Sequence, residues 1–102
     1  MKSIIQKDKE CFWCFKRSNL ESHHIYSGKN RDNSEKYGLK VWLCHKHHRG
    51  EYWAHGRSGK YVNRHLRRIG QIHFEKEYPD LSFADIFGRN YINKNQIFTK
   101  NV

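Results

Sequence analysis

The residues with the clearest chemistry lie between Cys11 and His48. Two pairs of metal-ligand type, Cys11-x-x-Cys14 and Cys44-x-x-His47, have the same internal spacing. Thiolates and imidazoles at this spacing bind zinc in closed, four-coordinate structural sites. The sequence therefore predicts a Cys3His zinc site that joins an N-terminal turn to the start of a helix.

Two alternatives use the cysteines differently. A Cys11–Cys14 disulfide of the thioredoxin type requires a βαβ context, which the sequence lacks. Otherwise the thiols would simply be free. The chain has three cysteines, so they cannot all pair internally, and its first ten residues are too polar and too few for a signal peptide. These observations favour metal binding.

A second candidate site uses histidines outside the zinc pairs. His23 and His24 lie towards the end of an expected strand, and His48 lies in the first turn of the helix that follows. Two of these imidazoles could hold a catalytic cation with positions open for water and phosphate, and a third could accept a proton from water. The alternative is that all three are polar residues packed beneath a basic surface.

These side chains must be positioned by a strand–loop–strand–helix unit. The pattern predicts strands over residues 20–26 and 39–43. Between them we expect a polar loop and one short helical turn that is capped by Asn33 or Ser34 and ends at Gly38. A helix follows from Cys44 to about Ala54, although Gly50 weakens it.

Two more helices are expected towards the C-terminus. Residues 61–78 form the best helical pattern, which is stopped by Pro79 and has a weak point at Gly70. Its apolar stripe comprises Val62, Leu66, Ile69 and His73, with Ile72 beside them. A short helix capped by Asp80 or Ser82 runs through Phe87, and residues 90–102 read as a strand or a loose tail.

Size and charge limit the class of protein. The chain has 102 residues and a hydrophobic fraction of 36%, which predicts one domain with a thin core that needs a staple such as a metal. Its net charge of +10 indicates a polyanionic partner, with nucleic acid first and an anionic membrane surface second. A basic surface kept for solubility is the third interpretation. No apolar run is long enough to span a membrane, and we expect a cytoplasmic protein.

The order of these motifs resembles a known family. Cys-x-x-Cys, a His-His dipeptide, and a hydrophobic strand that ends in Leu-Cys-x-x-His-His are similar to the HNH endonucleases, also called ββα-metal or His-Me finger nucleases. The pattern resembles small HNH proteins of bacteriophages in particular, which would imply the host cytoplasm as the location. The resemblance covers roughly residues 11–50. It implies an α+β fold: one domain over 1–102, with a zinc-containing ββα-metal core at 11–50 and a helical extension at 58–102.

The resemblance also implies roles for the histidines. His23 and His48 would bind the catalytic divalent metal, and His24 would be the general base. Phosphate chemistry suits Mg²⁺ or Mn²⁺, while imidazole ligands also admit Ni²⁺, Co²⁺ and Zn²⁺. His55 lies on the face of His48 if the helix is continuous, which makes it a candidate third ligand. We interpret His65 and His73 as structural or solvated.

The chain departs from the family pattern at two places. Many members have Cys at the position of His47, so His45 and His48 are alternative zinc ligands. Leu39 occupies roughly the place of the family's middle Asn. Asn30 and Asn33 lie in the preceding loop but outside the usual register.

The implied reaction is metal-assisted hydrolysis of DNA. Basic residues near the site and on the long helix would hold phosphates: Lys29, Arg31, Arg49, Arg57, Arg64, Arg67 and Arg68. No helix is typical of base reading, so we expect weak sequence preference. A monomer could nick DNA, whereas a double-strand cut would need a dimer. The alternatives are a zinc-stapled nucleic-acid-binding module without catalysis and a two-zinc structural protein.

Overall fold

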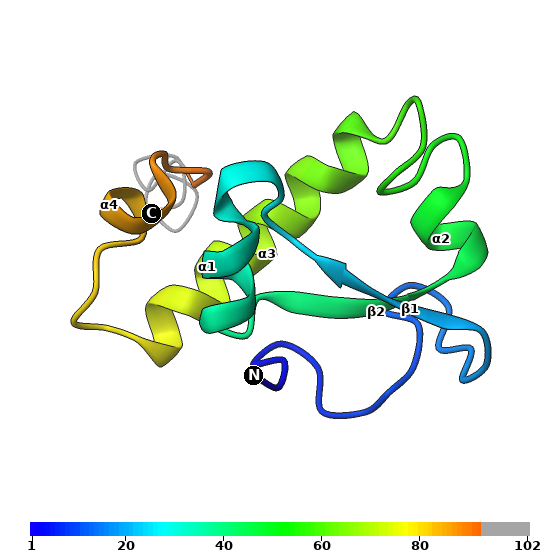
Figure 1. Ribbon diagram of the computed structural model, residues 1–102, viewed down its shortest axis with the longest axis horizontal. Coiled ribbons are helices and arrows are strands. Elements are labelled where there is room, and N and C mark those ends of the chain that lie inside the picture. The colour runs from blue at the N-terminus through cyan, green and yellow to red at the C-terminus, as the bar shows by residue number, and fades with distance from the viewer. Residues whose placement is uncertain (93–102) are drawn as a thin grey trace, which may run out of the picture.

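A two-stranded antiparallel sheet forms the centre of the computed structural model, which describes residues 1–92 (Figure 1). Strand β1 (Leu20–His24) pairs with β2 (Lys40–Cys44) so that His23 lies opposite Val41 and His24 opposite Lys40. Between the strands lie η1 (Gly28–Asn30) and α1 (Arg31–Lys36), and α2 (His45–Arg49) follows β2 directly. The expected α+β class and the order strand, strand, helix are confirmed.

Three predicted boundaries were wrong. The first strand ends at His24 rather than at Tyr26, and the expected polar loop at 29–33 is helical. The helix expected to reach Ala54 ends at Arg49, because Gly50 adopts an extended conformation with ψ 156°. The sequence predicted a helical turn only from Asn33 or Ser34 onward, and hydrogen bonds to residues outside the segment help to hold the longer helical connection. The buried hydroxyl of Ser34 accepts from the backbone of Tyr26 at 3.3 Å and donates to the backbone of Leu39 at 2.5 Å.

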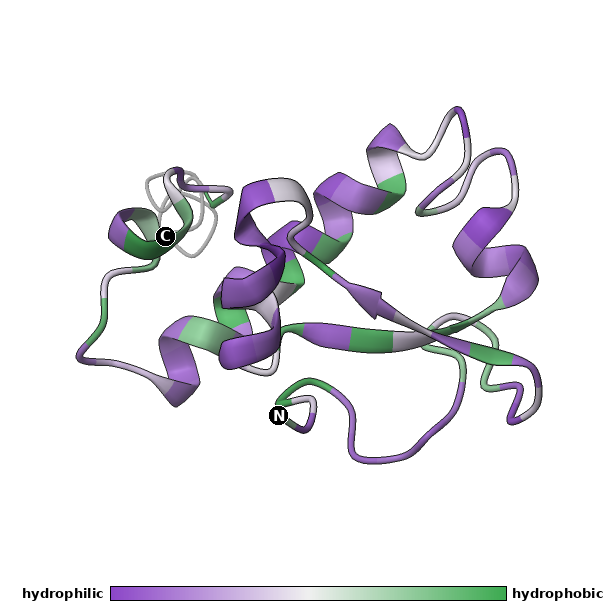
Figure 2. Cartoon of the chain, in the orientation of Figure 1, coloured by the Kyte–Doolittle hydropathy of each residue, from purple (hydrophilic) through white to green (hydrophobic). Residues whose placement is uncertain are grey.

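The two C-terminal helices match their predictions closely. Helix α3 (Lys60–Glu77) buries Leu66 and Phe74, and Figure 2 shows its hydrophobic positions interleaved with hydrophilic ones. Ile72, which we expected beside the apolar stripe, is 53% exposed. Helix α4 (Phe83–Phe87) begins at Ser82, whose hydroxyl accepts from the backbone N–H of Asp85 at 3.2 Å.

Tyr26, which follows β1, connects the end of that strand to helix α3. Its ring lies 4.7 Å from that of Phe87 and 5.4 Å from that of Phe83, and its hydroxyl donates to the backbone oxygen of Arg67 at 2.6 Å. A Cβ atom on Gly70 would lie 2.6 Å from the same hydroxyl oxygen. The weak point of the helix is therefore the place where the Tyr26 ring approaches its backbone.

No helix within residues 1–92 is long and apolar enough to cross a membrane. The strand or tail expected over 90–102 lies outside the described residues from 93 onward.

Candidate metal centres

Four donor atoms converge where the N-terminal turn meets the end of β2. The donors of the zinc cluster (Cys11, Cys14, Cys44 and His47) all lie within 4.8 Å of one another. Cys14 Sγ lies 3.8 Å from Cys44 Sγ, and His47 Nδ1 lies 3.5 Å from Cys11 Sγ and 3.2 Å from Cys44 Sγ. Ordinary zinc bond lengths at tetrahedral angles predict about 3.8 Å between two sulfurs and about 3.6 Å between sulfur and nitrogen. The cluster could therefore hold a structural metal such as zinc.

Backbone contacts position and polarise the first thiol. The backbone N–H of Phe12 donates to Trp42 in β2 at 2.8 Å, which anchors the turn to the sheet. Burial opposes ionisation of Cys11, but hydrogen bonds from the backbone of Cys44, Cys14 and Trp13 outweigh it and lower its pKa to about 6. A thiolate is the form that binds metal, and none of the three cysteines forms a disulfide.

The alternative zinc ligands lie elsewhere. His45 is 73% exposed at its side chain, and its Nδ1 donates to Glu21 at 3.1 Å. His48 belongs to a second group of imidazoles. Of the three histidines weighed, it is thus His47 whose nitrogen faces the thiols.

The second group, the three-His cluster, contains His23, His48 and His55. One ring nitrogen from each lies within 4.8 Å of the other two. His23 comes from β1, His48 from α2, and His55 from the loop after α2. The ring centroids of His48 and His55 are 4.4 Å apart, and each lies 5.1 Å from that of His23. His23 and His48 are buried and His55 is exposed, so the cluster opens to solvent on one side.

His55 reaches the cluster by a turn rather than by a continuous helix. Its backbone N–H donates to the carbonyl of His48 at 2.6 Å, which folds the loop back onto α2. The expectation that His55 joins His48 is met, but the helix assumed in the sequence ends six residues earlier, at Arg49.

Three nitrogen atoms of the cluster lack protein partners. Within residues 1–92, both ring nitrogens of His23 and Nε2 of His48 are buried without a hydrogen bond. A buried polar atom without a partner costs about 1–3 kcal/mol, and this cost is removed when the atom binds a ligand such as a metal ion. Burial first, and then the charges of His48 and His55, lower the pKa of His23 to about 3. His23 is thus neutral at physiological pH, and a neutral imidazole offers a lone pair to a metal.

Glu21, which was not among the predicted site residues, contacts the three-His cluster through His48. Its carboxylate accepts from Nδ1 of His48 and, at 3.0 Å, from Nε of Arg49. Hydrogen bonds from His48 and then from His45 lower the pKa of Glu21 to about 2. Since Nδ1 of His48 carries the shared proton, Nε2 keeps a free lone pair directed away from Glu21. A signal did exist, because Glu21 and His23 are two residues apart on a strand and share one face.

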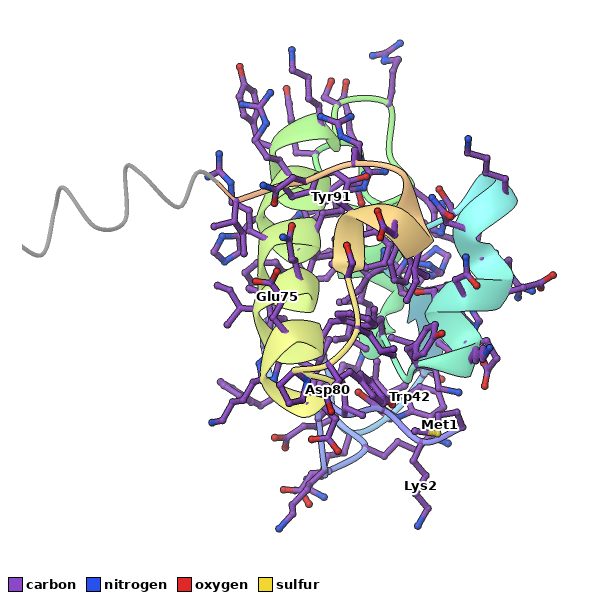
Figure 3. The ribbon with its side chains drawn as sticks, turned by 90° about the vertical axis from the view of Figure 1, so that its left-hand side faces the viewer. Met1, Lys2, Trp42, Glu75, Asp80 and Tyr91 are labelled. Atoms are coloured by element: carbon purple, nitrogen blue, oxygen red, sulfur yellow. The ribbon has the colours of Figure 1, made fainter. Side chains whose placement is uncertain are left out.

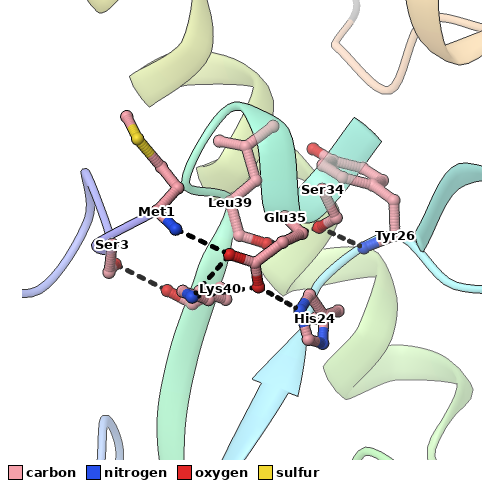
Figure 4. A network of polar contacts seen from close by, with 8 residues as sticks. All are labelled: Met1, Ser3, His24, Tyr26, Ser34, Glu35, Leu39 and Lys40. Carbon is pink, nitrogen blue, oxygen red and sulfur yellow. Dashed lines mark hydrogen bonds and ion pairs between the residues drawn. The ribbon is translucent and has the colours of Figure 1, made fainter. Parts of the chain in front are cut away.

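His24 follows His23 on β1 and therefore lies on the opposite face of the strand. Figure 4 shows its ring directed towards Glu35. Its Nε2 donates to Glu35 at 2.8 Å, and Glu35 also accepts from Lys40 at 3.0 Å and from the amino group of Met1 at 2.8 Å. The Met1 amino group first, and then His24 and Lys40, hold the pKa of Glu35 well below its usual range. His24 is not a member of the three-His cluster.

The side chains of the two candidate asparagines form structural hydrogen bonds. The side-chain amide of Asn30 donates to the backbone of Phe87 at 2.9 Å, and that of Asn33 donates to the backbone of Ile86 at 3.3 Å. Both tie the helical connection to α4, and Leu39 is buried in the core.

The predicted phosphate-binding residues separate into three places. Lys29 and Arg31 lie exposed at η1 and α1, while Arg49 and Arg57 form ion pairs with Glu21 and Glu51. The α3 residues Arg64, Arg67 and Arg68 line a common hollow.

No family model, curated protein or solved structure matches this chain. Its function must therefore be inferred from the two clusters themselves.

Proposed function

We propose that this chain is a metal-dependent DNA endonuclease of the HNH type. The observation that supports this most strongly is the three-His cluster, in which buried imidazole nitrogens converge without protein partners and one side opens to solvent. A closed thiolate-rich site beside an open imidazole site is the combination expected of a structural metal next to a catalytic one.

His23, His48 and His55 would hold the catalytic cation. A bound Mg²⁺ or Mn²⁺ would supply Lewis-acid stabilisation of phosphate charge, and imidazole ligands also admit Ni²⁺, Co²⁺ or Zn²⁺. Glu21 fixes the tautomer of His48 so that Nε2 is available as a ligand. Since His55 is the exposed member, a phosphate would approach from its side.

His24 would act as the general base, as the resemblance implies. Because Glu35 accepts a hydrogen bond from Nε2, neutral His24 has its lone pair on Nδ1, where it could take a proton from water. Glu35 would also stabilise the imidazolium that forms. This arrangement is analogous to the acid that orients a catalytic histidine in other hydrolases.

A zinc-stapled DNA-binding module without catalysis is the second candidate. The position of His24 favours it, because strand alternation points this side chain to the face opposite His23. In that case His24, Glu35 and Lys40 would form a structural polar network.

Nicking of supercoiled plasmid tests the proposal. We expect cleavage that requires added Mg²⁺ or Mn²⁺ and is lost in both His48→Ala and His24→Ala, with zinc content and circular dichroism unchanged. Glu35→Gln should lower the cleavage rate without changing metal affinity, because Glu35 contacts His24 and not the three-His cluster. If His24→Ala cleaves at the wild-type rate, the base assignment is wrong. If the wild type binds DNA but cleaves with none of these metals, the binding module is correct.

A further inference from the structure

A basic hollow lies between the first half of α3 and the segment that follows α4. It has a volume of about 520 Å³. We call it the α3 groove, and its cationic lining residues are Lys60, Arg64, Arg67, Arg68 and Arg89. Figure 3 shows Tyr91, which also lines it, beside one end of α3 and well away from Asp80 at the other end of that helix.

Among residues 1–92, the charges of the α3 groove have no acidic partner. Within residues 1–92, no carboxylate forms an ion pair with any of its five cationic side chains. By contrast, Arg17, Arg49 and Arg57 outside the groove each have an acidic partner. Like charges four residues apart on a helix, as at Lys60, Arg64 and Arg68, oppose folding. Their repulsion is relieved when a polyanion binds.

The far wall of the groove is fixed by buried hydrogen bonds. The side chain of Gln71, which is 2% exposed, donates to Asn90 Oδ1 at 2.6 Å and accepts from the backbone N–H of Tyr91 at 2.8 Å. The guanidinium of Arg89 lies over the Tyr91 ring at 4.7 Å from its centroid. Arg89 is thus held facing the arginines of α3, although it is distant from them in sequence.

The α3 groove continues towards the three-His cluster. Asn63, another lining residue, donates to the backbone oxygen of Ala54 at 2.8 Å, directly before His55.

We propose that the α3 groove binds the phosphate backbone of one DNA strand, to one side of the bond that is cleaved at the three-His cluster. The strand would run from His55 past Arg67 to Arg89. One guanidinium group can donate to two oxygens of a phosphate at once. A row of guanidinium groups can therefore bind successive phosphates of a DNA strand regardless of base sequence. This inference rests on the proposed nuclease function for its direction along the strand, but the binding itself does not require cleavage.

The test is the salt dependence of DNA binding by the double variant Arg64→Gln/Arg89→Gln. Fluorescence anisotropy with a labelled duplex, over a series of salt concentrations and without added divalent metal, gives the slope of log K against log salt. Each lost phosphate contact reduces that slope by about 0.9, so we expect a reduction of about 1.8 and weaker binding throughout. The matched control is Lys76→Gln, an exposed charge in the last turn of α3 outside the groove, which should leave the slope unchanged.

Two further arms identify the ligand. Inorganic phosphate should inhibit DNA binding no more than chloride at equal ionic strength, because one phosphate cannot span the row of arginines. If it competes stoichiometrically, the groove is a small-anion site and the proposal fails. Vesicles containing anionic lipid should bind the wild type and the double variant equally. If the double variant loses vesicle binding but keeps DNA binding, the proposal also fails.

A third variant separates this proposal from the nuclease proposal. His48→Ala should bind DNA with the wild-type slope while losing cleavage. If the wild type never cleaves but the double variant lowers the slope, the groove proposal stands and the nuclease proposal fails. If cleavage is observed but the double variant changes the slope no more than Lys76→Gln does, the groove proposal is wrong.

Discussion

Replacing Gly70 with alanine tests how α3 is seated on the sheet that supplies His23. A Cβ atom at this position would lie 2.6 Å from Tyr26 Oη and 3.2 Å from two of its ring carbons. The tyrosine cannot swing away freely, because it is 2% exposed and surrounded by the rings of Phe83, Phe87 and Tyr91. Moving it would also stretch the bond from its hydroxyl to Arg67.

Two effects of opposite sign decide the outcome. Alanine is a better helix former than glycine by about 1 kcal/mol. Overpacking a close-packed core costs about 1–3 kcal/mol, and weakening a buried hydrogen bond adds about 1 kcal/mol. The loss is larger than the gain, so we expect Gly70→Ala to lower the free energy of unfolding by about 1–3 kcal/mol net. For a domain of this size that corresponds to a fall in Tm of about 4–24 °C.

Thermal and urea unfolding of the zinc-loaded protein measure this change. The control is the same substitution in a Tyr26→Phe background, where the oxygen atom that the new Cβ meets is absent. There the cost of Gly70→Ala should shrink, and a double-mutant cycle gives the coupling between the two positions. A Gly70→Ala variant that is more stable than the wild type would show that helix propensity prevails and that Tyr26 does not approach α3 as described.

Three further predictions concern the two metal centres. Cys44→Ser should lose zinc and fold poorly, because structural zinc contributes about 10–16 kcal/mol in small zinc-dependent domains; a variant with one zinc per chain and unchanged Tm would contradict the zinc cluster. Glu21→Gln should weaken metal binding at the three-His cluster by roughly 10- to 100-fold, because Glu21 orients His48. The control Glu51→Gln, an exposed acid paired with Arg57, should have no effect on Mn²⁺ titration. Without added divalent metal, stability should fall as the pH drops from about 6.5 towards 3, because His23 has a pKa of about 3 when folded and the unfolded chain then binds one more proton. The fall is at most about 1.4 kcal/mol per pH unit for one group. Urea midpoints at pH 7 and pH 5 should differ less in His23→Gln than in the wild type, and an equal difference would refute the assignment.

Local sequence signals predicted the elements that depend on nearby residues. Helix α3 follows from spacings of three and four and from Pro79, and α4 follows from its Ser82 cap and from Gly88, which has a φ of 84°. The zinc cluster follows from two identical spacings on either side of a hairpin, because pairing of the strands brings their ends together.

The sequence did not predict the features that depend on contacts outside the local segment. The helical connection before β2 is polar and exposed, and its fold depends partly on the bonds of Ser34 to residues before and after it. Glu35 lies eleven residues after His24, and the fold rather than any spacing rule brings the two side chains together. His55 was predicted to join His48 for the wrong reason, since a turn and not a helix brings it back.

The most direct test of the central proposal is a Mn²⁺ titration of protein that already holds one zinc, followed by the electron paramagnetic resonance signal of the free ion. We expect the wild type to bind one Mn²⁺ per chain, His48→Ala to bind none, and both proteins to retain their zinc. Binding of Mn²⁺ that persists in His48→Ala, or no binding by the wild type, would contradict an open metal site at His23, His48 and His55.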